Sequence, residues 1–134
     1  MMKVAIIGSR SYTNSRKIKD FIYKLKESFG DELEIVSGGQ KEGSDGYAKK
    51  YALEFDVKYS EFPPQHYSHN MHCVRPNYEY GKKYYVSNYF KRNKQIAGYS
   101  DRIVAFVSNP NNITSGTLST LQYAEKMNKK SIII

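Results

Sequence analysis

The sequence predicts a three-layer α/β fold around a parallel sheet of five strands in the order 3-2-1-4-5. Short apolar runs alternate along the 134 residues with longer segments of helical spacing, which is the pattern of repeated strand–helix units. Three of these runs end in glycine-bearing turns, and each turn precedes a helix-like segment. Because such crossovers are right-handed, one switch point gives this order and falls between the first and fourth strands.

The first predicted strand and helix have clear limits. Lys3 to Gly8 is apolar on both faces, as in a buried strand. Asn14 or Ser15 is suited to cap the helix that follows, and Gly30 is suited to end it. The side chains expected to face the core recur at helical spacing: Ile18, Ile22, Leu25 and Phe29.

The next two strands enclose a second helix. Leu33 to Ser37 and Val57 to Phe62 are the expected strands, and Pro63-Pro64 ends the later one. Between them, Ser44 is expected to cap the helix. The residues of this helix expected to point inward are Ala48, Tyr51, Ala52 and Phe55.

The second half of the chain begins with a long loop. Residues 63–83 lack regular periodicity, which predicts an aromatic loop or lid. A helix is expected from Tyr84, a fourth strand over Arg102 to Val107, and a fifth over Ser131 to Ile134. The residues expected to point inward from the third helix are Val86, Tyr89, Phe90, Ile96 and Ala97. Those of the fourth helix are Leu118, Leu121, Ala124 and Met127.

Composition predicts one domain with a negatively charged partner. A chain of this length can bury one hydrophobic core, so residues 1–134 are expected to form a single domain. The formal net charge of +8 favours an anionic partner, and a nucleotide, a nucleic acid and a membrane surface are all consistent with it. No apolar stretch approaches the roughly 18 residues that cross a bilayer, and no membrane partner is expected. The single cysteine, Cys73, fits a cytoplasmic protein, and the many tyrosines favour a homo-oligomer.

The turn after the first strand is Gly8-Ser9-Arg10. Gly8 lets the backbone approach a ligand, Ser9 offers a hydroxyl, and Arg10 offers a bidentate clamp for a phosphate. Ser11 and Thr13 stand where a dinucleotide-binding fingerprint has glycines, so that motif is excluded. The alternative is an ordinary strand-to-helix turn.

The turn after the second strand is also rich in glycine. Ser37-Gly38-Gly39 is followed by Gly43 and then by Ser44-Asp45. Gly38 and Gly43 have P-loop spacing, but the lysine that a P-loop ATPase needs is missing, which excludes that enzyme class. Asp45 either complements the positive start of its helix, accepts a ribose hydroxyl, or acts as an active-site acid.

Two further segments complete the candidate site. Ser115-Gly116-Thr117 stands at a helix start, where backbone amides suit a phosphate; the alternative is a simple capped helix. Arg92 could reach over the crevice, and Asn93 falls among apolar neighbours; the alternative is an exposed arginine beside an asparagine bonded to backbone. Because turns at the carboxyl ends of parallel strands share one edge, all these segments are expected to converge on one anionic ligand.

A cluster within the predicted loop has the residue types of a metal site. His66, His69, His72 and Cys73 lack the spacing of a closed zinc site, so no metal and no cofactor are expected. Tyrosines interleaved with lysines in the same stretch either stack on a base or form an amphipathic lid.

Taken together, these motifs resemble those of the YspA-like branch of the SLOG superfamily, which is related to DprA and LOG proteins. The residues that carry the resemblance are Gly8-Ser9-Arg10, Ser37-Gly38-Gly39, Gly43, Asp45, Ala48, Arg92-Asn93, Asp101 and Gly116-Thr117. The resemblance implies a Rossmann-like domain that binds a nucleotide or a nucleotide-derived signalling ligand, often as a sensor in phage or bacterial conflict systems.

The phosphoribohydrolases of the superfamily carry a Pro-Gly-Gly-x-Gly-Thr turn and a glutamate three residues later. Here the turn spans Ile113 to Thr117, and Thr120 holds the glutamate position. The missing carboxylate argues against catalysis and leaves Asp45 and Arg92 as catalytic candidates, with Asp101 a further acid. We expect a sensor or sequestering protein for an ADP-ribose-like molecule or a nucleoside phosphate. The first alternative is an enzyme acting on nucleoside monophosphates, either an N-glycoside hydrolase of the phosphoribohydrolase type or a ribosyl transferase. The second is a single-stranded nucleic-acid binder.

Overall fold

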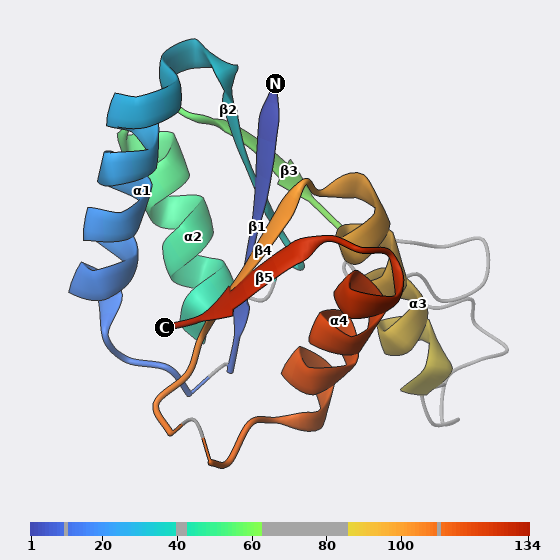
Figure 1. Cartoon of the computed structure of the whole chain (residues 1–134). Helices are drawn as coiled ribbons and strands as arrows, with labels where there is room; N and C mark the ends of the chain where they lie inside the picture. Colours follow the sequence, from blue (N-terminus) through green and yellow to red (C-terminus); the bar gives the residue numbers. More distant parts are fainter. Residues whose placement is uncertain (10, 40–42, 63–85, 110) are drawn as a thin grey trace, which may run out of the picture.

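The computed structural model describes residues 1–9, 11–39, 43–62, 86–109 and 111–134, and only the backbone of residues 86–90. Strands and helices alternate along the chain (Figure 1). The strands are Met2–Gly8 (β1), Leu33–Ser37 (β2), Lys58–Glu61 (β3), Arg102–Phe106 (β4) and Lys130–Ile133 (β5). The helices are Ser15–Phe29 (α1), Gly43–Glu54 (α2), Val86–Tyr99 (α3) and Ser115–Lys126 (α4), with a 3-10 turn at Gly30–Glu32 (η1).

The five strands form one parallel sheet in the order β3-β2-β1-β4-β5. This confirms the strand order predicted from the sequence. The central strand β1 pairs with β2 on one side and with β4 on the other, so that Val4 lies opposite both Ile35 and Arg102. The switch point therefore lies between β1 and β4, where open α/β sheets bind their ligands.

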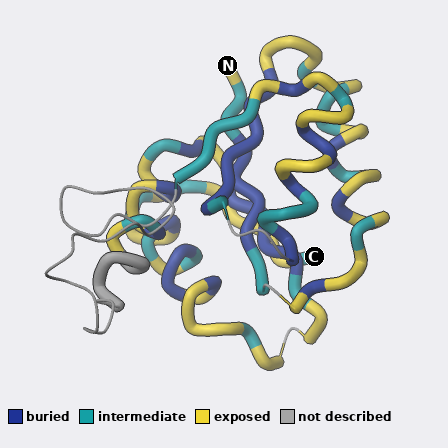
Figure 2. The backbone as a smooth tube through the Cα atoms, turned by 180° about the vertical axis from the view of Figure 1, so that it is seen from behind, coloured by how far each residue is buried: buried dark blue, intermediate teal, exposed yellow. Residues whose placement is uncertain are grey.

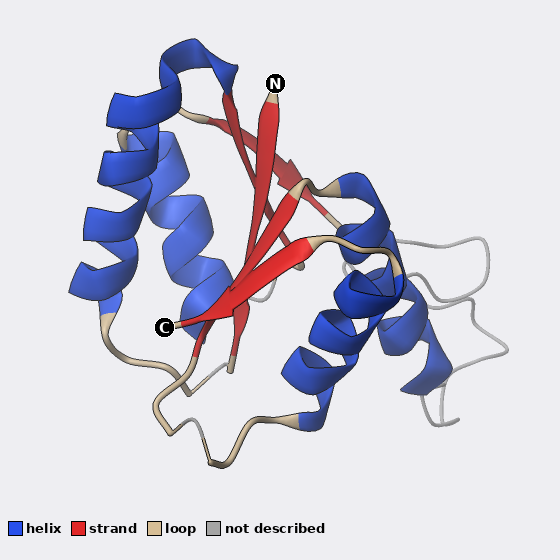
Figure 3. Cartoon of the chain, viewed as in Figure 1, coloured by secondary structure: helices blue, strands red, loops and turns tan. Residues whose placement is uncertain are grey.

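Helices cover both faces of the sheet, with α1 and α2 on one face and α3 and α4 on the other (Figure 3). Strand residues alternate between these faces, as period-two geometry requires. Ile6, Ile35 and Phe106 pack with the α1–α2 layer, whereas Ala5 and Ile103 pack with the α3–α4 layer. The buried strands consequently form the centre of the molecule (Figure 2).

The limits of α1 are those that the sequence predicted. The Asn14 side chain caps the helix, since its Oδ1 accepts a hydrogen bond from the Lys17 amide at 3.3 Å. Gly30 ends it, with its N–H donating to the Lys26 carbonyl. The expected capping role of Ser44 is wrong, because α2 already begins at Gly43. Ser44 lies inside the first turn, and its Oγ donates to the Phe106 carbonyl at 3.5 Å.

The expected core-facing stripe of α4 is wrong at Leu118. That side chain is 43% exposed, whereas Thr117, Thr120 and Ala124 are buried. The buried positions are three and four residues apart and face α3, against which α4 packs. Polar threonines thus occupy the inner face of the helix start, next to the pocket described below.

Within the described ranges, two turns place a non-glycine residue in the left-handed region. Asp56, after α2, has φ 57°, and Asn128, after α4, has φ 58°. We expect Asp56→Gly and Asn128→Gly each to raise the free energy of unfolding by about 0.5–1 kcal/mol, because glycine adopts this conformation without a Cβ penalty. Urea unfolding followed by circular dichroism measures the change. Asn112→Gly, at a position outside the left-handed region, is the control and should give no gain.

A fully buried carboxylate, that of Glu34, joins β2 to β3 and α3 through polar contacts. Glu34 is 0% exposed, and its Oε2 accepts hydrogen bonds from Ser60 at 2.8 Å and from Tyr99. Its Oε1 lies 3.2 Å from the Lys58 ammonium. Burial by itself would raise the pKa of the Glu34 carboxyl, but these hydrogen bonds and the lysine charge hold that pKa below its ordinary value.

Acid is expected to weaken the wild type more than the Glu34→Gln variant. Because the folded state lowers the pKa of Glu34, its ionised form contributes stability above the unfolded value of about 4.3. That contribution is lost as pH falls through the lower folded value. Urea unfolding should therefore show the wild type more stable at pH 7, with the gap closing below about pH 4. An unchanged gap between pH 7 and pH 3 would contradict this account; Glu54→Gln, at an exposed position, is the control.

Candidate functional site

A pocket of about 300 Å³ lies at the carboxyl end of β1, where the turns after β1 and β2 meet the start of α4. It adjoins the switch point of the sheet, as the fold requires of a ligand site. The structure brings eight of the sequence-predicted site residues to the lining of this pocket: Gly8, Ser9, Gly38, Asp45, Arg92, Asn93, Gly116 and Thr117. Turns from distant parts of the chain thus meet around one hollow.

Other predicted site residues lie nearby without lining the pocket. Ser37 is buried, and its hydroxyl bonds to Tyr59 instead. Gly39, Gly43 and Ser115 flank the lining residues along the chain. Arg10, the predicted loop at 63–83 with His66, His69, His72 and Cys73, and the side chains of Val86, Tyr89 and Phe90 fall outside the described residues.

The turn after β1 lets the backbone reach the pocket. Gly8 has φ +154°, and a Cβ placed there would collide with Ser44 Oγ and with the Phe106 carbonyl oxygen. Only glycine fits between these two neighbours. The Ser9 hydroxyl oxygen accepts from the Ser11 amide at 3.0 Å and contacts the Ser11 hydroxyl at 2.6 Å. The Ser9 side chain therefore orders its own turn.

The charged groups of the pocket, Arg92 from α3 and Asp45 from α2, meet at the turn after β2. The Arg92 guanidinium donates from Nη1 to the Gly38 carbonyl at 2.9 Å and to the Phe62 carbonyl at 3.4 Å. A Cβ on Gly38 would lie 2.9 Å from Arg92 Cζ and 3.0 Å from Asp45 Oδ2. One positive and one negative side chain thus approach the same glycine, and a larger residue there would displace the ends of both side chains.

Asn93 joins α3 to the start of α4. It is 5% exposed, and its Nδ2 donates to the Gly116 carbonyl at 3.3 Å, while its Oδ1 accepts from Arg92 Nε at 3.0 Å. Thr120 also donates to the Gly116 carbonyl, at 3.2 Å. Asn93 is therefore satisfied by helix backbone and holds Arg92 at the same time.

The start of α4 lines the pocket at Thr114, Gly116 and Thr117, and its N-cap residue makes no side-chain cap. The Thr114 hydroxyl donates to Thr117 Oγ1 at 2.9 Å rather than capping a backbone N–H. No acidic residue lies in the first turn of this helix. A helix start with this composition suits a negatively charged ligand group.

Sequence reasoning missed four lining residues: Ile7, Ile96, Thr114 and Thr120. Helical spacing was the available signal for two of them. Ile96 follows Arg92 by four residues, and Thr120 follows Gly116 by four, so each lies on the same helix face as a predicted site residue. The two isoleucines give the pocket an apolar wall.

The expectation that Asp101 is a further candidate acid of the site is wrong. Its Oδ2 accepts a hydrogen bond from the Lys3 amide at 2.9 Å, and its own amide donates to the Lys3 carbonyl at 2.7 Å. Asp101 therefore precedes β4 at the amino-terminal edge of the sheet, opposite the pocket, because all strands are parallel. It cannot serve the pocket as an acid.

Two features are absent from the described residues. In the described ranges, no group of three or more His, Cys, Asp or Glu side chains is arranged to hold a metal ion. No helix of that same part of the chain has the length and hydrophobicity needed to cross a membrane.

Solved structures of other proteins share the fold. DNA processing protein A (DprA) from Streptococcus pneumoniae has a TM-score of 0.74 at 21% identity, covering 99% of this chain and 50% of that one. DprA from Helicobacter pylori, described with a single-stranded DNA binding mode, has a TM-score of 0.71 at 23% identity, covering 98% and 64%. The molybdenum cofactor binding protein from the phototrophic bacterium Rippkaea orientalis has a TM-score of 0.66 at 20% identity, covering 98% and 75%.

These likenesses show the fold, and the chain spans less than two thirds of either DprA chain. No curated protein matches the chain in sequence. The model of the YspA, cpYpsA-related SLOG family matches residues 2–69, just over half of the chain. The matched segment runs from β1 through β3 and includes the turns at Gly8 and at Gly38. The resemblance predicted from the sequence is thereby confirmed, and the chain belongs to the YspA, cpYpsA-related SLOG family.

Proposed function

We propose that this pocket binds a nucleotide or a nucleotide-derived signalling ligand, an ADP-ribose-like molecule or a nucleoside phosphate, and that it does so through a phosphate group. One observation carries the proposal: Arg92 is bonded in place beside the start of α4 and the Gly8 turn, in one pocket. A guanidinium and a helix start both favour an anion, and a glycine turn admits close approach.

Each part of the pocket has a place in this proposal. The backbone amides around Gly8, Ser9, Gly116 and Thr117 are assigned to phosphate oxygens, with Arg92 supplying the charge. Asp45, half-buried at the start of α2, is assigned to a ribose hydroxyl, since an ionised carboxylate accepts hydrogen bonds and repels phosphate. Ile7 and Ile96 offer an apolar surface to the sugar or base. The whole chain is proposed to act as this one ligand-binding domain.

Calorimetric titration with AMP, ADP-ribose and a single-stranded oligonucleotide tests the proposal. We expect saturable binding of at least one nucleotide that changes little between low and moderate salt. At a 100-fold excess over the dissociation constant, that ligand should stabilise the folded protein by about 2.7 kcal/mol. If neither AMP nor ADP-ribose binds at millimolar concentration, the proposal is wrong.

Single-stranded nucleic acid is the second candidate partner. The net charge of +8 favours it, and the Helicobacter pylori protein of the same fold is described with a single-stranded DNA binding mode. This function predicts oligonucleotide affinity that falls steeply as salt rises, because counterions are released from each neutralised phosphate. The salt dependence therefore separates the two candidates in the same titration.

An N-glycoside hydrolase acting on nucleoside monophosphates is the enzymatic alternative. Asp45 is the carboxylate among the described lining residues, and Thr120, which holds the glutamate position of the phosphoribohydrolases, is buried and hydroxyl-bearing. Chromatography of AMP incubated with the protein decides the matter. Free adenine formed at turnover rates, and lost in Asp45→Asn, would establish catalysis.

We also propose that the chain acts in the cytoplasm as a homo-oligomer that senses or sequesters its ligand in a phage or bacterial conflict system. The single Cys73 supports the compartment. Exposed apolar side chains on α4 and β5 support self-association: Leu118, Ile132 and Ile133. Native mass spectrometry reports subunit number and any co-purified ligand together, and a monomer at micromolar concentration would contradict the oligomer.

A further inference from the structure

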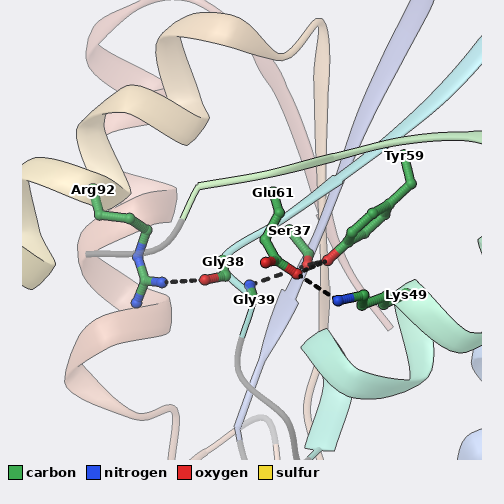
Figure 4. Close-up of polar contacts among 7 residues, drawn as sticks. All are labelled: Ser37, Gly38, Gly39, Lys49, Tyr59, Glu61 and Arg92. Carbon is green, nitrogen blue, oxygen red and sulfur yellow. Dashed lines mark hydrogen bonds and ion pairs between the residues drawn. The ribbon is translucent and has the colours of Figure 1, made fainter. Parts of the chain in front are cut away.

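The turn after β2 is held from the side of β3 by an ordered chain of hydrogen bonds (Figure 4). The Gly39 amide donates to Ser37 Oγ at 3.3 Å, and Ser37 Oγ lies 2.5 Å from Tyr59 Oη. Tyr59 in turn donates to Glu61 Oε1 at 3.0 Å, and the Lys49 ammonium lies 3.4 Å from the same oxygen. Two strands and a helix therefore converge on one turn.

The direction of this chain follows from the supply of protons. A neutral tyrosine has one hydroxyl proton, and Tyr59 uses it to donate a hydrogen bond to the Glu61 carboxylate. The Ser37 hydroxyl must then donate to Tyr59, which leaves the Ser37 oxygen to accept from the Gly39 amide. Tyr59 thus determines which way the Ser37 hydroxyl points, and through it where the turn lies.

Tyr59 is well suited to stay a donor. Its burial raises its pKa well above the ordinary value of about 10, and the negative charges of Glu61 and Asp45 raise it further, against an opposing effect of the Ser37 hydrogen bond. The phenol is therefore neutral at any physiological pH.

Arg92 holds the same turn from the opposite side. Its Nη1 donates to the Gly38 carbonyl at 2.9 Å and to the Phe62 carbonyl at 3.4 Å, as Figure 4 shows for Gly38. Phe62 is itself joined to the end of β2, because its amide donates to the Ser37 carbonyl at 2.9 Å. The position of the guanidinium consequently depends on where the Gly38 carbonyl points.

We propose that Tyr59 is a positioning residue for the pocket: acting through Ser37 and the Gly38–Gly39 turn, it fixes the Arg92 guanidinium so that the pocket prefers a phosphate to a neutral group. Tyr59 does not line the pocket among the described residues, so its effect is indirect. The inference rests on the proposed function, since it assigns Arg92 to a phosphate.

The ratio of AMP affinity to adenosine affinity tests the proposal, because only AMP carries the phosphate. In Tyr59→Phe, which keeps the ring, we expect AMP affinity to fall roughly tenfold and adenosine affinity to change less than about twofold. Ser37→Ala breaks the same chain and should act likewise. Tyr99→Phe is the matched control, because it also removes a phenol hydroxyl bonded to a carboxylate, here that of Glu34.

A double-mutant cycle links the effect to Arg92. In an Arg92→Gln background, Tyr59→Phe should cause no further loss of AMP preference. Suppose that Tyr59→Phe and Ser37→Ala both keep the wild-type ratio of AMP affinity to adenosine affinity, and that Arg92→Gln loses it. This result would overturn the positioning role of Tyr59 but leave the proposed function standing. A wild type that binds AMP no better than adenosine, and that does not bind ADP-ribose, would overturn the proposed function itself.

A measurement without ligand decides the structural part of the inference. In the wild type, the Arg92 Nε–H, bonded to Asn93, should give a resolved NMR signal that exchanges slowly with water. That signal should exchange faster in Tyr59→Phe and Ser37→Ala and stay unchanged in Tyr99→Phe. Unchanged exchange in both test variants would overturn the proposal whatever the ligand proves to be.

Discussion

The Gly8→Ala variant is expected to lose about 2–5 kcal/mol of unfolding free energy, a large part of the stability of a domain this size. A Cβ at this position has no free space, since Ser44 Oγ and the Phe106 carbonyl oxygen both lie within contact distance of it. The backbone also has φ +154°, which side-chain-bearing residues rarely adopt. Urea unfolding followed by circular dichroism measures the loss.

Gly116→Ala is the matched control for this variant. Gly116 lies in the first turn of α4 and also lines the pocket, but a Cβ there meets nothing within 4 Å. Alanine favours a helix over glycine, so we expect an unchanged or slightly higher unfolding free energy. Equal losses in the two variants would refute the claim that Gly8 is required by its neighbours.

The Arg92→Gln variant is expected to bind AMP roughly 10- to 100-fold more weakly than the wild type, as for the loss of charge-assisted hydrogen bonds. Glutamine keeps a polar side chain, but it is shorter than arginine and cannot supply the charge or the bidentate geometry of a guanidinium. Isothermal titration calorimetry measures the affinity, and thermal unfolding checks that the variant is folded under the conditions used.

Lys94→Gln separates a local effect of Arg92 from the general positive charge. Lys94 lies two residues further along α3, is exposed, and loses the same charge. Its AMP affinity should stay within about twofold of the wild type at moderate salt, because exposed charges are screened. Similar losses in both variants would show that overall charge, rather than the pocket, governs binding.

The fold could be predicted because local signals and global topology agree. The apolar run of β1, the Asn14 cap and the Gly30 stop each point to the same element limits that the structure has. Right-handed crossovers then leave little freedom in strand order. Where local signals conflicted with packing, the prediction was wrong. Leu118 continues an apolar spacing, yet α4 turns Thr117 and Thr120 inward instead.

The convergence of turns in one pocket could also be predicted, because it follows from parallel strands and glycine positions. Sequence reasoning could not supply the connections between side chains. Nothing in the spacing shows that Ser44 bonds to Phe106, which is 62 residues away, or that Asp101 is held by Lys3 on the far edge of the sheet. Tyr59 and Glu61 are two residues apart in β3 and therefore lie on the same face of the strand. This spacing was the available signal for the hydrogen-bond network behind the pocket.

The most direct test of the account is a titration of isotopically labelled protein with AMP, followed by backbone NMR. We expect saturable shifts that are largest at Gly8, Ser9, Gly116 and Thr117 and at the Arg92 side chain. Saturable shifts confined to another surface, or no saturable shifts with either AMP or ADP-ribose at millimolar concentration, would contradict the claim that this pocket receives a phosphate.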